Sequence, residues 1–365
     1  MIIKNGLIYT ENFNFEKKDL FIENNRIVES YADLNDITEI DASGNYIIPG
    51  LVDIHTHGCI GHDFCDNDKN GLIAIAKYLR KNGITSFCPT SMTLAKEDLI
   101  AIYKSASTPM STDCSQIVGL NMEGPFISTA KKGAQNGKFI SAPNSAFFYE
   151  LNNACNHLIK LVTIAPESEN ALSFIHEFKN TVSISLGHSE ADYDKASDAL
   201  DAGANHITHL YNAMPPYNHR EPGIIGAAFD HADTFVELIC DGIHIHPSVI
   251  RSTFQLFGDR VILISDSMMA TGMPNGIYEL GKQTVYMQDK KAVLEDGTLA
   301  GSASNLFDCM RNAVSFGIPL TDAVKAVTAT PAKSIGMYDE LGSLSVGKRG
   351  DVVIMDTEMN LIRVI

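Results

Sequence analysis

The sequence predicts an α/β fold, namely a (β/α)8 barrel of the TIM type with a small β domain formed by the two ends of the chain. From residue 50 to about residue 337, apolar strand-like runs alternate with helix-like segments, which is typical of a parallel sheet built from βα units. Outside that stretch, short β-type runs separated by tight turns replace the alternation. A chain of 365 residues is long enough for one large and one small domain.

The terminal segments predict the small domain. Residues 2–9 and 19–29 are β-type runs broken by Asn-Gly and Asn-Asn, which indicate tight turns in a small antiparallel sheet. The C-terminal tail returns to short β-type runs, so we expect it to rejoin that sheet. The predicted domains are therefore 1–49 plus 338–365 for the small one and 50–337 for the barrel.

The barrel needs eight strands, and the apolar runs supply eight candidates. They lie at 50–55, 84–88, 116–122, 159–165, 181–186, 205–209, 234–240 and 261–265. Helical spacing of apolar residues is clear at 70–81, 96–107, 169–179, 191–202, 247–257, 304–316 and 321–336. Turn signals near residues 275 and 296 indicate a β-hairpin insertion over about 274–300. An open doubly wound sheet remains an alternative, although no Gly-x-Gly-x-x-Gly pattern accompanies the first strand.

Composition narrows the class of protein. The chain has 28 Lys and Arg against 44 Asp and Glu, a formal charge of −16, which repels a nucleic-acid backbone. The seven cysteines include no Cys-x-x-Cys and are expected to be reduced, buried thiols. With neither a signal-peptide pattern nor a long apolar run, we expect a cytoplasmic protein with no membrane or nucleic-acid partner.

Charged and imidazole side chains follow most of the predicted strands. His55 and His57 end the first strand and, being two residues apart, project from one face. The later strand ends carry Glu123, His188, His209, His244 and Asp266. Each alone has an ordinary explanation, such as a rim histidine or a turn cap. Because the carboxyl ends of barrel strands meet at one face, the set together predicts a metal site.

The residue types indicate metal-assisted hydrolysis. Glu123, His188 and His209 form a typical ligand set for a catalytic divalent metal, which would lower the pKa of a bound water. Asp266 is the candidate general base that takes the water proton and passes it to a departing amine. Nitrogen and oxygen ligands suit zinc or iron first, with manganese or cobalt as alternatives, and one or two ions per subunit are possible.

Several strings resemble a known family. The stretch at 48–58, Ile-Pro-Gly-Leu-Val-Asp-Ile-His-Thr-His-Gly, and the stretch at 341–353 are similar to the two ends of the amidohydrolase superfamily. Met-Glu-Gly-Pro-Phe at 122–126, His-Leu-Tyr-Asn-Ala-Met-Pro at 209–215 and His-Arg-Glu-Pro-Gly at 219–223 resemble N-acetylglucosamine-6-phosphate deacetylases in order and spacing. The likeness extends over nearly the whole chain.

The resemblance implies a barrel with a small β-sandwich, usually a homodimer, that hydrolyses N-acetyl-D-glucosamine 6-phosphate to D-glucosamine 6-phosphate and acetate. In that family the residues matching Glu123, His188 and His209 bind the main metal, and Asp266 matches the catalytic acid/base. His55 and His57 match a second metal site that only some members possess.

The resemblance also implies a phosphate site. Arg220 and His244 match phosphate contacts, with the arginine reaching in from the neighbouring subunit, and Asn212 and Ala213 match backbone contacts. Arginine forks onto phosphate oxygens with paired hydrogen bonds, which agrees with this role. The ordinary alternative for Arg220 is a surface ion pair with a neighbouring acid such as Glu221.

One position departs from the family pattern. Gln135 stands where the family typically has a histidine that contacts the substrate's acetyl carbonyl. A glutamine amide can donate a hydrogen bond but cannot carry positive charge, so we expect weaker oxyanion stabilisation with activity retained. Two alternatives to the deacetylase remain: another amidohydrolase, acting on a different N-acyl sugar, an N-acyl amino acid or a cyclic amide, and a non-catalytic scaffold of the same fold.

Overall fold

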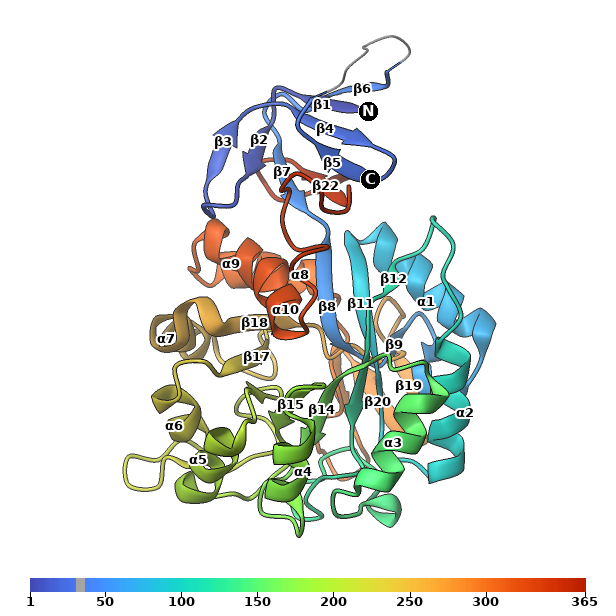
Figure 1. The fold of residues 1–365 in the computed structure, drawn as a ribbon, viewed down its shortest axis with the longest axis vertical. Helices are drawn as coiled ribbons and strands as arrows, with labels where there is room; N and C mark the ends of the chain where they lie inside the picture. The colour runs from blue at the N-terminus through green and yellow to red at the C-terminus, as the bar shows by residue number, and fades with distance from the viewer. Residues whose placement is uncertain (31–36) are drawn as a thin grey trace.

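The computed structural model describes residues 1–30 and 37–365, so residues 31–36 of the predicted terminal domain lie outside the described part. Figure 1 shows a barrel surrounded by helices and, at its upper end, a smaller group of strands that holds both termini. Strand β8 leaves the smaller group and enters the barrel. The two ends of the chain therefore build one β domain, as the sequence predicts.

Eight parallel strands form the barrel, which confirms the predicted fold class. In order around the sheet they are β8 (Leu51–Thr56), β11 (Ile84–Ser91), β13 (Leu120–Glu123), β14 (Ile159–Ile164), β15 (Ser183–Leu186), β16 (His206–Ile207), β17 (Phe235–Ile239) and β18 (Val261–Ile264). Strands buried on both faces read as nearly continuous apolar runs, and β14, β17 and β18 follow that pattern.

The first and eighth strands meet at a seam that is held by few bonds. The backbone N–H of Asp266 donates to the carbonyl of His55 at 2.9 Å, and the N–H of His57 donates to the carbonyl of Ser267 at 2.8 Å. An isolated parallel bridge joins Thr56 and Ser267. The seam places the histidines of the first strand beside the aspartate that follows the eighth.

Ten α-helices lie in the part of the chain that the structure describes. They are α1 (Lys69–Lys81), α2 (Lys96–Ala106), α3 (Ser145–Ala154), α4 (Ala171–Phe178), α5 (Tyr193–Ala202), α6 (Gly223–Asp230), α7 (Pro247–Phe257), α8 (Leu306–Ser315), α9 (Leu320–Val327) and α10 (Ala329–Ser334). Side-chain caps begin several of them; Asp68, for example, accepts from the backbone N–H groups of Asn70 and Gly71. None of the described helices is long and apolar enough to cross a membrane.

The structure differs from the prediction in several helices and strands of the barrel. Helices α3 and α6 were not predicted, because α3 is rich in aromatic residues and α6 is apolar on every side, which hides the helical period. The predicted helix at 321–336 is two helices, since the backbone of Thr328 leaves the helical region with φ −130° and ψ −80°. The predicted strand at 116–122 is divided into β12 (Gln116–Ile117) and β13, because the register against β11 shifts by one residue between them.

The terminal segments form two sheets rather than one. One sheet has the order β5-β4-β1-β6 and the other β23-β22-β7-β2-β3. Their bounds are β1 (Ile2–Lys4), β2 (Leu7–Tyr9), β3 (Phe15–Lys17), β4 (Leu20–Glu23), β5 (Arg26–Val28), β6 (Glu39–Asp41), β7 (Tyr46–Pro49), β22 (Val352–Met355) and β23 (Leu361–Val364). Apolar side chains of both sheets, among them Ile3, Leu20, Ile47 and Val352, form one buried core.

The insertion after the eighth strand is a three-stranded antiparallel sheet and not a simple hairpin. Its strands are β19 (Gly276–Leu280), β20 (Gln283–Gln288) and β21 (Lys291–Val293). The side chain of Gln283 donates to the carbonyl of Ala134, in the loop after β13. Lys282 pairs with Asp98 of α2 at 2.9 Å. These contacts hold the insertion against the carboxyl end of the barrel.

Candidate metal centre

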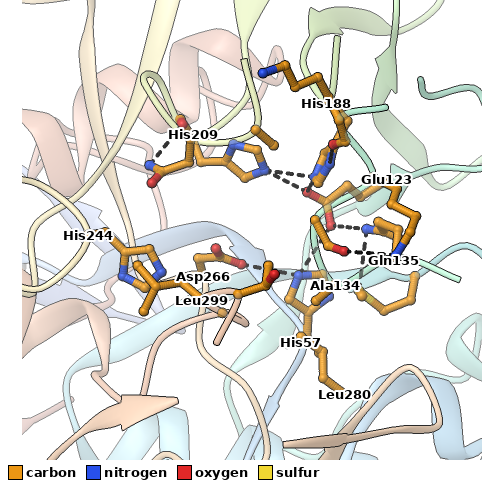
Figure 2. Close-up of a pocket in the computed structure, with 18 of the residues that line it drawn as sticks. His57, Glu123, Ala134, Gln135, His188, His209, His244, Asp266, Leu280 and Leu299 are labelled. Atoms are coloured by element: carbon orange, nitrogen blue, oxygen red, sulfur yellow. Dashed lines mark hydrogen bonds and ion pairs between the residues drawn. The ribbon is translucent and has the colours of Figure 1, made fainter. Parts of the chain in front are cut away.

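A cavity of about 480 Å³ opens at the carboxyl ends of the barrel strands. Figure 2 shows imidazole and carboxylate side chains from several strands converging on it. The predicted residues that line it are His57, Glu123, Gln135, His188, His209, Asn212, Ala213, His244 and Asp266. His55 is fully buried and contacts two of these residues, whereas Arg220 is exposed and does not line the cavity. The structure therefore brings together ten of the eleven predicted site residues.

Glu123, His188 and His209 form the first cluster. One carboxylate oxygen of Glu123 lies 3.1 Å from Nε2 of His188 and 3.1 Å from Nε2 of His209. The two Nε2 atoms are themselves 3.0 Å apart. The ligand atoms of the three residues all lie within 4.8 Å of one another, a group that could hold one metal ion.

His55, His57 and Asp266 form a second cluster next to the first. Oδ1 of Asp266 lies 3.5 Å from Nε2 of His55 and 3.2 Å from Nε2 of His57. Glu123 contacts this cluster too, because each of its two oxygens lies 3.4 Å from one of these imidazoles. Glu123 is thus shared between two groups of ligands, so that the two candidate metal positions are adjacent.

In three of the imidazole rings, the hydrogen bond made by Nδ1 determines that Nε2, the nitrogen that faces the cluster, carries the lone pair. Each Nδ1 faces an acceptor: Lys131 carbonyl oxygen for His188 at 2.8 Å, Thr90 carbonyl oxygen for His57 at 3.1 Å, and Glu237 carboxylate for His55 at 2.9 Å. Since an acceptor requires the proton on Nδ1, the neutral form of each ring presents a lone pair at Nε2. Such outer contacts are usual for metal-binding histidines.

The residues present fit a divalent cation. Lone pairs at Nε2 would otherwise face carboxylates and one another, and Nε2 of His55 is buried with no hydrogen-bond partner. Burial favours neutral imidazole, yet Glu237, Glu123 and Asp266 raise the pKa of His55 well above its ordinary value. The surrounding carboxylates therefore require positive charge at this point, which a metal ion supplies with the right donor atoms.

Asp266 lies at the floor of the cavity as an ionised carboxylate. Burial raises the pKa of Asp266. The charge of His55 and the hydrogen bond of His57 lower this pKa by more than burial raises it, so the net shift is downward. Its backbone has a φ of 48°, in the left-handed region, and is held there by the seam bond to His55. This geometry directs the carboxylate, which belongs to the second cluster, into the cavity, as Figure 2 shows.

Gln135 contacts Glu123 as well as lining the cavity. Its Nε2 donates to a carboxylate oxygen of Glu123 at 2.8 Å, and its Oε1 accepts from the backbone N–H of Thr93 at 2.6 Å. The side chain is almost fully buried, and its amide is occupied by these partners. The amide therefore holds the shared carboxylate, a contact that the sequence did not indicate.

The candidate phosphate-binding residues differ in how their donors are used. The backbone N–H and the side-chain amide of Asn212 both donate to the carbonyl of His209. Burial lowers the pKa of His244, but a 2.7 Å hydrogen bond to Asp241 outweighs it, so the pKa is raised and the imidazolium is favoured. Arg220 projects from an exposed loop, and its backbone N–H donates to Asn218.

Sequence reasoning missed several residues of the site. Lys131 and Lys132 line the cavity from the loop after β13, and Asp296, Thr298 and Leu299 line it from the segment after the inserted sheet. Glu237 lies in the centre of β17, where an acid within an otherwise apolar strand, Phe-Val-Glu-Leu-Ile, was a readable signal. The insertion residues carried no signal, because nothing local indicates where an insertion packs.

A (β/α)8 barrel with histidines and carboxylates at the carboxyl ends of its strands is typical of metal-dependent hydrolases. The sequence model of the Amidohydrolase family matches residues 46–364, and the chain belongs to that family. Within it, the chain is similar to the N-acetylglucosamine-6-phosphate deacetylase of Bacillus subtilis, with 36% identity over 99% of this chain and 91% of the relative.

Two further comparisons agree. The N-acetylgalactosamine-6-phosphate deacetylase of Escherichia coli O157:H7 is 33% identical over 89% of this chain and 87% of its own length. The structure of the N-acetyl-D-glucosamine-6-phosphate deacetylase of Mycobacterium smegmatis, an aspartate-to-alanine mutant in complex with N-acetyl-D-glucosamine 6-phosphate, superposes with a TM-score of 0.92. That match has 31% identity and covers 100% of this chain and 97% of the other. The resemblance stated from the sequence is confirmed.

Proposed function

We propose that this chain hydrolyses N-acetyl-D-glucosamine 6-phosphate to D-glucosamine 6-phosphate and acetate with a divalent metal. The observation that carries the proposal is the shared position of Glu123, which contacts both imidazole pairs at the floor of a cavity beside Asp266. The relatives named above, one of them described in complex with this sugar phosphate, support the choice of substrate.

Glu123, His188 and His209 would hold the main metal, and His55, His57 and Asp266 could hold a second. A bound divalent metal polarises the amide carbonyl and acidifies a water molecule. Asp266, held ionised beside His57, accepts the proton of the attacking water and later delivers it to the amine nitrogen as the carbon–nitrogen bond breaks. Gln135 keeps the carboxylate of Glu123 in place during both steps.

The phosphate group needs cations and N–H donors away from the scissile amide. His244 offers an imidazolium, and Ala213 lines the same cavity. Lys131 and Lys132 add positive charge at the wall of the cavity. We place Arg220 across a homodimer interface, in the partner's site, because it is exposed and does not line the cavity of its own chain.

Zinc or iron suits the imidazole and carboxylate ligands of the proposed centre, and we propose two ions per subunit because two ligand groups adjoin. All seven cysteines are free and buried, which agrees with a reducing cytoplasm as the place of the reaction. Elemental analysis of protein purified without added metal identifies the ion and its stoichiometry.

The substrate assignment is tested by comparing N-acetylglucosamine 6-phosphate, N-acetylglucosamine and N-acetylgalactosamine 6-phosphate while acetate release is measured. We expect kcat/KM to fall by about 100-fold or more without the phosphate, since charge-assisted hydrogen bonds to it contribute about 3 kcal/mol together. Equal values with and without phosphate would overturn the assignment in favour of another amidohydrolase. A higher kcat/KM for the galactosamine compound would move the proposal to that epimer.

A further inference from the structure

Glu237 is a charged side chain in a place where charge is costly. It lies in the middle of β17 with no exposed surface, between the apolar residues Val236 and Leu238. An ionised carboxylate buried at this depth persists only where several donors surround it. Glu237 does not line the cavity, so it contacts no substrate, and the mechanism proposed above does not use it.

Three donors meet the carboxylate of Glu237. One oxygen, Oε2, accepts from Nδ1 of His55 at 2.9 Å and from the backbone N–H of His209 at 3.0 Å. The other, Oε1, lies 3.2 Å from Nε2 of His206. The main-chain carbonyl of Glu237 also accepts from the N–H of Leu210 at 2.8 Å.

The contact with His55 orients a ligand of the second cluster. A carboxylate at Nδ1 keeps the proton on that nitrogen and turns the lone pair of Nε2 toward Glu123 and Asp266, at 3.4 and 3.5 Å. The negative charge also makes the imidazole a stronger donor to a metal. A neutral acceptor in the same place would keep the orientation but not the charge.

The contacts with residues 209 and 210 hold the main cluster. His209 has a φ of 28°, in the left-handed backbone region that residues other than glycine rarely adopt, so its backbone needs external support. The side chain and the carbonyl of Glu237 bind two consecutive N–H groups of this turn. One residue therefore fixes a ligand from each cluster, His55 by its ring and His209 by its backbone.

We infer that Glu237 is a positioning residue that couples the two metal positions, setting the donor strength of His55 by its charge and the placement of His209 by its geometry. This inference rests on the proposed metal centre and is independent of which sugar phosphate is the substrate. It predicts that charge and geometry can be separated by two substitutions at the same residue.

Glu237→Gln removes the charge and keeps the shape. The carbonyl oxygen of the glutamine can take the place of Oε2, and its NH2 group can face Nε2 of His206. Nε2 then has to accept this hydrogen bond, and the proton of the His206 ring can move to Nδ1, which has no partner among the described residues. We expect zinc at the second position to bind about 10- to 100-fold more weakly and zinc at the main position to stay within about threefold. Glu237→Ala removes both acceptors, and both zinc ions should bind at least about tenfold more weakly.

Asp53→Asn is the matched control. Asp53 is also fully buried and lies on the same strand as His55. It accepts hydrogen bonds from the backbone N–H groups of His55 and Ser265, but within the described part of the chain it makes no hydrogen bond or ion pair with an imidazole ring. Its substitution should lower stability and leave both zinc affinities within about threefold of the unaltered protein. The readout is zinc bound per subunit of the full chain across buffered free zinc concentrations, with circular dichroism to confirm folding.

Unchanged zinc binding by Glu237→Gln overturns the inference, even if Glu237→Ala fails to fold. Equal weakening by Asp53→Asn also overturns it, because loss of any buried carboxylate would then have the same effect. If the unaltered protein binds only one zinc ion, His55 has no metal to hold and the coupling is refuted. The deacetylation assay is separate, so failure of the substrate assignment would appear as missing acetate release with zinc binding intact.

Discussion

Gln135→Glu tests whether Gln135 supports Glu123, because the two side chains are nearly isosteric. The substitution replaces the Nε2 donor, 2.8 Å from Glu123, by a carboxylate oxygen, while the oxygen that accepts from Thr93 is kept. A protonated glutamic acid reproduces both hydrogen bonds of the glutamine. An ionised one places two negative charges side by side in a buried position.

The expected cost follows from this geometry. Two charges 2.8 Å apart repel by about 6 kcal/mol at an effective dielectric constant of about 20. Taking up a proton is cheaper, since a carboxyl with a pKa of about 4.3 is protonated at about pH 7 for about 4 kcal/mol. The pKa of the introduced glutamate is thus raised in the folded state. The variant therefore has its full stability below about pH 4.3, and its free energy of unfolding falls by about 1.4 kcal/mol for each pH unit above that value.

Urea unfolding of the Gln135→Glu variant and the unaltered protein, in the presence of a chelator and between about pH 5 and pH 7, measures this difference. Gln135→Leu is the control: it loses both hydrogen bonds at every pH, and we expect a constant deficit of about 2–4 kcal/mol. A deficit of the glutamate variant that does not grow with pH would refute the assigned contact with Glu123.

Three further predictions concern the reaction. Asp266→Asn should lower turnover by about 100- to 10,000-fold while the main metal is retained, measured as acetate release and metal content. Replacing His55 and His57 by alanine should lower the metal content towards one ion per subunit, with activity reduced; an unchanged content would show that they are not ligands. Arg220→Ala should raise KM for the phosphorylated substrate at least about tenfold. Mixing the Arg220→Ala and Asp266→Asn variants should restore activity if the arginine acts across a dimer, because a mixed dimer then has one site with both residues. If mixing restores no activity, Arg220 does not act across the interface.

The barrel was predictable because its signals are local and repeated. Several strands that are buried along their length, such as β14 and β18, are largely apolar runs, and most helices between the strands show apolar spacing on one face. The terminal domain was predictable only as β structure. Whether its short strands form one sheet or two depends on pairings such as β7 with β22, which join residues 46–49 to 352–355. No local pattern contains that information.

The ligand set was predictable for a related reason. Parallel strands end at one face, so polar residues at strand ends are brought together whatever the details of packing. Residues that act through a ligand follow no such rule. Gln135 reaches Glu123 from a loop, and Glu237 of β17 reaches His55 of β8 across β18 and the seam of the barrel. Their roles depend on distances of a few ångströms that only the folded chain defines.

The second ligand group also lies at the seam of the barrel. Strands β8 and β18 are joined by an isolated bridge and a few backbone bonds, whereas the other neighbouring strands pair in ladders, some of them with register shifts. His55 and His57 come from one side of this seam and Asp266 from the other. A metal bound by all three would join the two sides and stabilise the folded state by its binding free energy. Loss of these ligands should therefore affect the closure of the barrel as well as the chemistry.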